Sequence, residues 1–445
     1  MTAVESFRSA AAAHQRCFWL DGGGAREWSG RRSLVGWLER EDVSLTYDAA
    51  ARVVTRHAAG RAEVVGDDPF AVLADELASG SRRDQWFGYF GYACRPDLPA
   101  LVAPPGSDVP DAVWMRPSHV RLFDHPAAED SPADRGNRTL RGEASGHNLR
   151  IPRLTGESDA SPPGTYRAHF AAVQEALHAG NSYEVNLTYR LDAESELDPV
   201  AAYLRLRELN PAPYAGFLQH DVEGARGWLL SSSPERYALV TRDEEDGTRT
   251  IETKPIKGTT PRGATPEEDE ELRTQLATEP RFRAENLMIT DLLRNDLAMV
   301  CEVGTVEVPS LLAVESYQTV HQLVSTVRGR LRDDVTTVGA LRALFPAGSM
   351  TGAPKLRTME VITEVEETPR GAYAGAFGWL AADGRADLGV IIRTLTTTGD
   401  GGYRQVYRLG TGGGITVHSE VEDEYAESRW KAERLLRALS PIDQA

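Results

Sequence analysis

Short segments with strand-like alternation, separated by tight turns, recur through most of this sequence and limit the folds open to it. The pattern predicts strands at 214–219, 227–232, 236–241 and 248–256, with Asp246-Gly247 as a hairpin turn. A second hairpin is predicted over 373–397, turning at Asp383-Gly384. Apolar residues at helical spacing predict helices near 166–177, 199–209, 266–277, 283–299 and 420–439. Many antiparallel strands with interspersed helices indicate an α+β fold and not a βαβ series.

A change of composition divides the chain. Residues 1–123 carry the tryptophans, aliphatic residues and turn glycines of a folded region, and Trp86 to Tyr92 reads as a buried strand. Residues 124–164 are rich in Pro, Ala, Gly, Ser, Asp and Arg, so we expect a flexible connection there, because burial cannot offset its ordering entropy. Residues 165–445 form the third region. The boundary does not require independent domains.

The charge balance excludes several classes of partner. Lysine and arginine number 49 against 66 aspartate and glutamate residues, which gives a net charge of −17. A surface this acidic repels phosphate backbones, so we expect no nucleic-acid partner. No apolar run reaches the length of a membrane span. The N-terminus lacks a signal peptide, and the three cysteines form neither a metal nor a disulfide pattern, so we expect a cytoplasmic protein.

Two glycine-containing segments invite a phosphate-binding interpretation that their spacing does not support. In GTGGGI, Ile415 stands where the dinucleotide fingerprint needs its third glycine, and the following ITVH reads as a strand. The run is either a plain turn or a set of backbone N–H groups presented to an anion such as a carboxylate. PAGSMTGAPK does not fit the Walker A spacing and reads as a structural loop, with Pro354 starting the next helix.

Acidic residues on two predicted helices are candidate metal ligands. Glu424, Glu427 and Lys431 share one helix face, although solvated charge stripes of this kind are common. Glu285 lies on an apolar stripe, where a carboxylate is costly unless it is paired or ligates a metal; the alternative is an acid favoured by the helix start. Oxygen ligands without cysteine or clustered histidine would suit Mg²⁺.

Lys257 stands between a predicted strand and a Gly-Thr turn. A lysine at such a bend is usually a surface cation. It becomes a nucleophile only where desolvation or neighbouring cations lower its pKa.

Taken in order, these segments resemble the chorismate-utilising enzyme family. The resemblance spans about residues 165–440 and looser parts of the first 120, and it rests on SSSPERYALV, IETKPIKGTTPRG, AENLMITDLLRND, HQLVSTVRG, FPAGSMTGAPK, GAYAGAFGWL, IIRTL, GTGGGI and EYAESRWKAERLL. It implies a two-sheet antiparallel β-sandwich core flanked by helices, with the N-terminal region woven into it. The active site would lie in a cleft between the sheets.

Within the family, PIKGT resembles the branch that aminates chorismate at C4, whereas anthranilate-forming members carry alanine in place of Lys257. The resemblance implies that Lys257 attacks C2 and expels the C4 hydroxyl, and that ammonia then adds at C4 and expels the lysine. Glu235, in SPER, would protonate the departing hydroxyl.

The resemblance implies further site residues. Glu285 and Glu427 would ligate Mg²⁺, with Glu424 nearby through water. Arg393, Tyr373 and Lys431 would bind a substrate carboxylate together with the amides of Gly412, Gly413 and Gly414. His321, Thr259 and Thr351 would line and polarise the pocket.

One position departs from the family pattern. The segment that usually reads YQVNL is YEVNL here, so Glu184 replaces a glutamine. Its carboxylate could steer ammonia or ammonium. No glutaminase signature is recognisable in the sequence, so the resemblance implies a separate glutamine amidotransferase subunit as the source of ammonia.

Several alternatives stay open. A relative of this kind could form anthranilate, aminodeoxyisochorismate or isochorismate instead, although Lys257 argues against the first. A protein of another class, a non-catalytic scaffold that activates a glutaminase, is disfavoured by the presence of Glu235, Lys257, Glu285 and Glu427. The product could serve 4-aminobenzoate and folate synthesis or a specialised metabolite such as an antibiotic.

Overall fold

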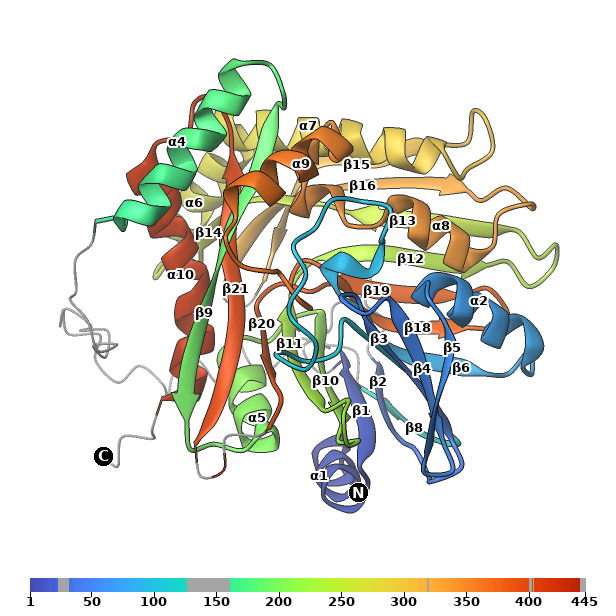
Figure 1. The fold of residues 1–445 in the computed structure, drawn as a ribbon. Helices are drawn as coiled ribbons and strands as arrows, with labels where there is room; N and C mark the ends of the chain where they lie inside the picture. The colour runs from blue at the N-terminus through green and yellow to red at the C-terminus, as the bar shows by residue number, and fades with distance from the viewer. Residues whose placement is uncertain (23–31, 126–160, 318–319, 400–401, 403, 441–445) are drawn as a thin grey trace.

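A computed structural model of the chain describes residues 1–22, 32–125, 161–317, 320–399, 402 and 404–440. Most of the connection expected at 124–164 lies outside these residues. The described chain forms two large antiparallel sheets with helices on their outer faces (Figure 1). The predicted α+β fold is confirmed.

The first sheet has nine strands, and all its pairings are antiparallel. In spatial order they are β17 (Gly352–Ala353), β9 (Glu184–Ser195), β21 (Gln405–Ile415), β20 (Thr394–Thr397), β11 (Gly227–Ser233), β10 (Tyr214–His220), β1 (Arg16–Asp21), β2 (Arg32–Trp37) and β8 (His119–Asp124).

The second sheet has twelve strands. Its main path is β14 (Ile256–Pro261), β16 (Val320–Arg330), β13 (Arg249–Lys254), β12 (Arg236–Arg242), β19 (Ala386–Val390), β18 (Ala376–Ala381), β6 (Gln85–Phe90), β7 (Ala112–Arg116), β3 (Val43–Asp48), β4 (Val53–Ala58) and β5 (Arg61–Gly66), and β15 (Glu307–Ser316) pairs with β16.

The N-terminal region is part of both sheets. It supplies β1, β2 and β8 to the first sheet and β3 to β7 to the second. Side chains from the two sheets meet between them, where the Phe18 ring on β1 stacks on Phe87 of β6 with ring centroids 4.0 Å apart. This interleaving is the reason the sequence break near residue 124 does not separate two independent cores.

Helices cover the outer faces. On the first sheet α1 (Ala3–Ala13), α5 (Pro199–Leu209) and α10 (Val421–Leu439) share one apolar cluster. The other described helices are α2 (Pro69–Ser79), η3 (Tyr92–Cys94), α4 (Gly164–His178), α6 (Pro266–Thr278), α7 (Pro280–Ala298), α8 (Thr337–Leu344), η4 (Gly348–Met350) and α9 (Lys355–Val365). Among the described helices, none is long and apolar enough to cross a membrane.

The helix predictions are confirmed, and their end signals explain them. Pro199–Leu209 is helical as expected, with Asp198 capping the N-terminus through Ala201 N. In α6 the side chain of Thr265 accepts a hydrogen bond from Glu268 N, and Pro266 occupies the first turn. Pro354 is the residue before α9, one position earlier than the sequence indicated.

Two strand predictions were wrong in part. The hairpin expected over 373–397 ends at Val390, because the chain then leaves the second sheet and β20 pairs with β11 in the first. The glycine run is neither a turn nor a loop but the end of β21, which pairs with β9 as far as Ile415, and the ITVH strand is absent from the described structure. Alternation shows that a segment is extended, but it does not show which sheet receives it.

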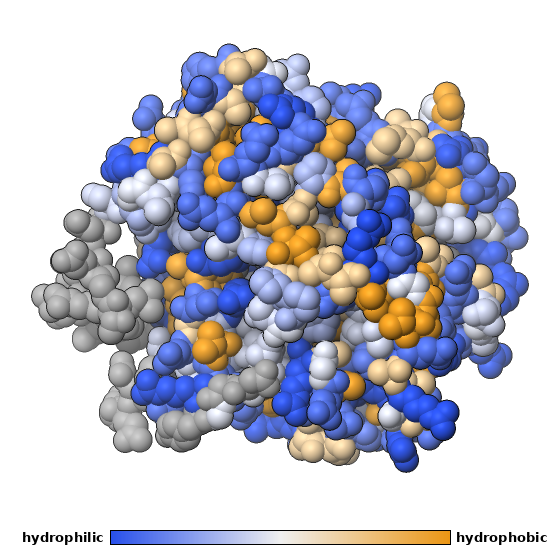
Figure 2. Space-filling model, viewed as in Figure 1, coloured by the Kyte–Doolittle hydropathy of each residue, from blue (hydrophilic) through white to orange (hydrophobic). Residues whose placement is uncertain are grey.

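The face shown in Figure 2 is mainly hydrophilic and carries only small hydrophobic patches. This agrees with the net charge of −17.

Candidate active site

A cavity of about 110 Å³ opens between β9 and β21 of the first sheet and β14 of the second. Most of the predicted catalytic and carboxylate-binding residues line it. The lining is Asn186, Glu235, Lys257, Ser349, Met350, Tyr373, Ile392, Arg393, Gly410, Thr411, Gly412, Gly413, Gly414, Lys431 and Leu435.

The chain delivers two of these residues where it crosses between the sheets. Glu235 lies between β11 of the first sheet and β12 of the second, and Arg393 lies between β19 and β20. Arg393 adopts φ +50°, a left-handed conformation that costs energy in a residue with a Cβ. Both crossings are therefore built to turn a polar side chain into the space between the sheets.

Lys257, on β14, pairs with Glu184 at the start of β9. Its Nζ donates a hydrogen bond to Glu184 Oε1, and only 2% of the Glu184 side chain is exposed. Burial alone would lower the pKa of Lys257, but Glu184 and Glu285 reverse this and raise that pKa above its ordinary value. In the resting site, Lys257 is therefore protonated and forms an ion pair with Glu184.

Glu235 is a buried carboxyl group suited to proton donation. Burial raises its pKa to about 7, against the opposing effects of a hydrogen bond with Ser349 and of Lys257, Arg393 and Lys431. Below that pH it is mostly protonated, so it can act as an acid near neutrality.

Three cations face the cavity: Lys257, Arg393 and Lys431. Burial, followed by the charge of Arg434, lowers the pKa of Arg393 to about 10, which still leaves it charged at neutral pH. Lys431 Nζ donates to Gly412 O at 3.0 Å and lies 2.9 Å from Glu427 Oε1. The cavity is thus lined by three cations, of which Lys257 and Lys431 are paired with the carboxylates of Glu184 and Glu427.

The glycines of β21 leave room for these side chains. A Cβ on Gly414 would collide with Glu184 Oε1 and lie 2.9 Å from Lys257 Nζ. A Cβ on Gly410 would collide with the Tyr373 ring. Beyond Leu409, β20 no longer pairs with β21, so along its free edge the strand presents backbone groups to the cavity it lines.

Three carboxylates stand beside the cavity rather than in its lining. Glu285 Oε1 and Glu424 Oε1 both accept hydrogen bonds from the guanidinium of Arg281, at 2.9 and 2.5 Å. Burial raises the pKa of Glu285 and that of Glu424, whereas Lys431 lowers the pKa of Glu427. Among the described side chains, no three His, Cys, Asp or Glu residues are grouped to hold a metal.

His321, Thr259 and Thr351 do not line the cavity in the described structure. Both ring nitrogens of His321 are engaged, by Ser316 Oγ at 2.8 Å and Asp269 Oδ1 at 3.0 Å. Thr259 lies on β14 opposite Gln322, and Thr351 is fully buried. Their assigned pocket roles stay predictions.

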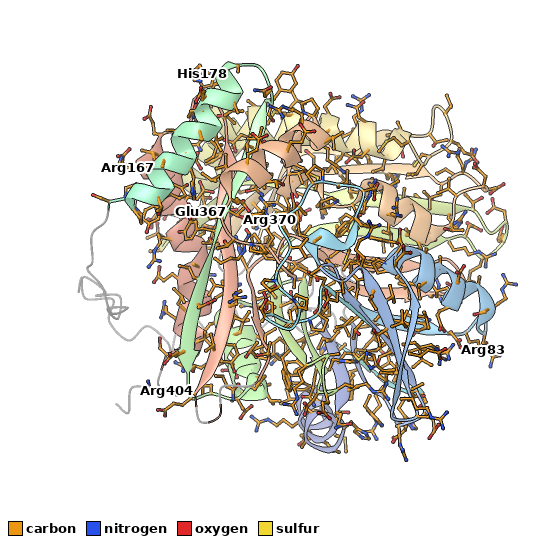
Figure 3. All side chains as sticks on the ribbon, in the orientation of Figure 1. Arg83, Arg167, His178, Glu367, Arg370 and Arg404 are labelled. Atoms are coloured by element: carbon orange, nitrogen blue, oxygen red, sulfur yellow. The ribbon has the colours of Figure 1, made fainter. Side chains whose placement is uncertain are left out.

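A buried network behind the cavity was not found from the sequence. Glu366 accepts bonds from Arg370 and from Thr188, and Arg370 also donates to Met350 O at 2.6 Å and Asn186 O at 2.8 Å. Figure 3 labels Arg370 toward the centre of the molecule, whereas Arg167 and Arg404 lie at its edge. Since Asn186 and Met350 line the cavity, this network fixes its wall. The sequence signal that could have indicated this network is the pair Glu366 and Arg370, which stand four residues apart on either side of Pro369.

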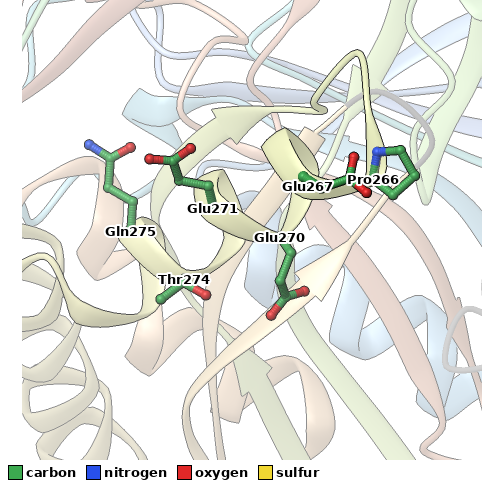
Figure 4. Close-up of a pocket in the computed structure, with 6 residues that line it drawn as sticks. All are labelled: Pro266, Glu267, Glu270, Glu271, Thr274 and Gln275. Carbon is green, nitrogen blue, oxygen red and sulfur yellow. The ribbon is translucent and has the colours of Figure 1, made fainter.

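A second hollow lies on the outer side of α6 (Figure 4). Its charged lining residues, Glu267, Glu270 and Glu271, are all acidic. It would repel an anion, so the interior cavity is the candidate site.

Comparison with known proteins identifies the family of this chain. A family model described as chorismate binding enzyme matches residues 15–437. The chain belongs to the chorismate-binding enzyme family. The match includes the N-terminal strands as well as every residue that lines the cavity.

The curated relatives include aminodeoxychorismate synthases. The enzyme of Streptomyces pristinaespiralis is 38% identical over 458 residues, covering 95% of this chain and 61% of the relative. Aminodeoxychorismate synthase component 1 of Escherichia coli (strain K12) is 43% identical over 274 residues, covering 62% of this chain and 57% of the relative. The chain thus spans about three fifths of the length of these relatives.

Among solved structures, anthranilate synthase component I from Streptococcus pneumoniae TIGR4 is similar with a TM-score of 0.70 and 27% identity, covering 92% of each chain. The fold of the chorismate-binding enzymes is therefore shared by proteins named for different products. The product must be argued from the cavity.

Proposed function

We propose that this chain aminates chorismate at C4 to give 4-amino-4-deoxychorismate. The observation that carries the proposal is that Lys257 and Glu235 line one cavity, together with Arg393 and Lys431. A nucleophile, an acid and cations for a dianionic substrate are then within one small space. The names of the curated relatives support the same product.

The proposed chemistry consists of two displacements. Lys257 Nζ, once unprotonated, forms a bond to C2 of chorismate while the ring double bonds shift and the C4–O bond breaks. Glu235 supplies the proton with which the hydroxyl departs as water. Ammonia then bonds to C4, the double bonds shift back, and Lys257 departs. Direct attack of ammonia at C2 would lead toward anthranilate instead.

The cations have a binding role in this proposal. The planar fork of Arg393 suits a carboxylate, and Lys431 and the backbone groups of β21 would share the second negative charge. Such local charge must outweigh the field of a protein whose net charge is −17.

The carboxylates beside the cavity supply the oxygen donors that magnesium prefers, although the described side chains are not grouped around a metal site. Glu285 and Glu424 already share one cationic group, the Arg281 guanidinium, and all the donors are oxygen atoms. We propose that Glu285, Glu424 and Glu427 hold Mg²⁺. When bound, the ion would offset the negative charge of a chorismate carboxylate.

Ammonia would come from a glutamine amidotransferase subunit, or from ammonium in vitro. The name "component 1" of the Escherichia coli relative is consistent with a partner component. We propose that the reaction takes place in the cytoplasm. A reducing compartment of this kind suits the three cysteines, which are free and buried.

Product analysis by mass spectrometry tests the proposal. The purified chain is incubated with chorismate, Mg²⁺ and ammonium, with and without an aminodeoxychorismate lyase. We expect a product that retains the pyruvyl ether, carries nitrogen in place of one oxygen, and gives 4-aminobenzoate only with the lyase. Anthranilate without the lyase would refute the C4 assignment. Stimulation of a glutaminase without chorismate turnover would favour the scaffold alternative.

A further inference from the structure

The pairing of Lys257 with Glu184 leaves one carboxylate oxygen unused. Glu184 is 1% exposed, and its Oε1 accepts the hydrogen bond from Lys257. Its Oε2 is buried and has no hydrogen-bond partner among the described residues. A buried, unsatisfied carboxylate oxygen is costly, so it calls for an explanation.

The same pairing creates a difficulty for the proposed nucleophile. An ammonium group has no lone pair, so Lys257 must lose a proton before it can attack. Glu184 and Glu285 raise the pKa of Lys257 and hold that proton in place. Some group within reach must therefore receive it.

The other carboxyl groups near Lys257 are already committed. Glu235 is mostly protonated below its pKa of about 7 and is needed as an acid. Glu285 accepts its hydrogen bond from Arg281 and is a proposed magnesium ligand. Glu184 is the carboxylate that accepts a hydrogen bond from Lys257 in the described structure.

We propose that Glu184 is the catalytic base that takes the proton from Lys257 Nζ and so creates the nucleophile. The inference rests on the proposed function. It also explains why Gly414 has no side chain, since a Cβ there would collide with Glu184 Oε1.

The proton balance closes over one cycle. A proton passes from Lys257 Nζ to Glu184, and the free amine bonds to C2 while the C4 hydroxyl leaves as water with the proton of Glu235. Ammonium supplies ammonia for C4 and returns one proton to Glu235. Lys257 departs as an amine and recovers its proton from Glu184. The net change is chorismate plus ammonium to aminated product plus water.

The charged groups around Lys257 come from four parts of the fold. They are Glu184 on β9, Glu235 between β11 and β12, Glu285 on α7 and Glu427 on α10. In the wild-type chain, proton transfer within the Glu184–Lys257 pair leaves the total number of protons unchanged. Adduct formation should then be flat with pH below about 7 and fall above it, as Glu235 loses its proton.

Replacing the base changes the shape of this profile. In Glu184→Gln, the proton of Lys257 must be released to solvent. Below about pH 7, the rate of adduct formation should therefore fall about tenfold for each unit by which the pH is lowered. Above that pH the unprotonated fraction of Lys257 rises while the protonated fraction of Glu235 falls. The two effects on the rate cancel, so the profile should flatten. The two profiles are therefore opposite in form.

The experiment mixes the full-length chain with chorismate and Mg²⁺, omits ammonium, and follows the covalent adduct by mass spectrometry of the quenched protein from about pH 5.5 to 8.5. Glu184→Asp keeps a carboxylate and should keep the flat limb at a lower rate. Glu194→Gln, at the exposed far end of β9, is the matched control and should behave as wild type.

A rising limb of slope one below pH 7 in the wild-type chain would overturn the inference, even if Glu184→Gln does not fold. A Glu184→Gln profile identical to wild type would overturn it as well. If the adduct forms with the expected profiles but ammonium yields anthranilate, the role of Glu184 stands and the C4 product fails. Chorismate turnover without any adduct would overturn both.

Discussion

Two buried ion pairs lie close to the same cavity, and they differ in how completely they are hydrogen-bonded. Glu366 accepts from Thr188 N, Thr188 Oγ1 and two nitrogens of Arg370, at 2.7 to 3.0 Å. Glu184 accepts from Lys257 at one oxygen, and its other oxygen has no partner in the described structure. Both glutamates are almost fully buried.

In the mechanism that we propose, the difference separates a structural pair from a chemical one. A fully satisfied arginine pair fixes geometry, because arginine keeps its proton and its fork is rigid. A lysine pair with spare acceptor capacity can exchange a proton. The first holds Asn186 and Met350 in the wall of the cavity, and the second presents Lys257 to its interior.

The largest effect is expected where the chemical pair is broken. Lys257→Ala should lower the proposed C4 amination by about 10³-fold or more, because the variant lacks the amine that forms the proposed covalent intermediate. Thermal stability should fall less than activity. Product formation with ammonium, measured beside a melting curve, checks both. Amination at the wild-type rate would contradict the covalent route.

Breaking the structural pair should chiefly cost stability. Arg370→Gln leaves Glu366 buried without its bidentate partner, and we expect a loss of about 3–5 kcal/mol in the free energy of unfolding. Arg167, which pairs with Glu422 at the surface, supplies the matched control, and Arg167→Gln should leave stability unchanged. Urea denaturation of both variants measures this. Equal stabilities would show that the buried network is not structural.

Two adjacent glycines sharpen the comparison further. In Gly414→Ala the new Cβ would meet Glu184 and Lys257, whereas in Gly413→Ala it would lie 3.2 Å from Glu424 Oε2 and 3.7 Å from Lys431 Nζ. Displacing the reactive pair should slow adduct formation by about 10²-fold. The Gly413 variant should lose less. A reversed order would place the critical contact at Glu424.

The smallest effect concerns Arg281, whose side chain is 38% exposed. Its guanidinium engages the same carboxylates that we propose for Mg²⁺, so the ion must displace it. Arg281→Gln should bind Mg²⁺ more tightly by about 1 kcal/mol, roughly fivefold. Isothermal titration of the chain with MgCl₂ measures this without turnover. Weaker binding would mean that Arg281 supports the site instead of competing for it.

Local signals predicted much of the fold. Periodicity, proline and capping residues located α5, α6 and α10, and alternation located β10 to β13. They could not assign β20 to the first sheet, because sheet membership depends on partners far away in sequence. The glycine run was not recognised as the end of β21 for the same reason, since its pairing with β9 decides it.

The candidate site was predicted unevenly. Glu235, Lys257, Arg393 and Lys431 do line one cavity, although only the family resemblance linked them beforehand. Arg281 was missed because an arginine one helical turn before Glu285 looks like an ordinary surface pair. His321 was placed in the pocket by resemblance, but its ring is held by Ser316 and Asp269 outside the lining.

The chain has four lysines, Lys254, Lys257, Lys355 and Lys431, which makes the central claim unusually open to a direct test. Besides Lys257, the other three form ion pairs: Lys254 with Glu315, Lys355 with Asp296 and Lys431 with Glu427. The chain is incubated with chorismate and Mg²⁺ in the absence of ammonium, the reaction is quenched, and the modified peptides are mapped by mass spectrometry. We predict a mass increase equal to chorismate less water, confined to Lys257. An adduct on another lysine, or none while chorismate is consumed, would contradict the account.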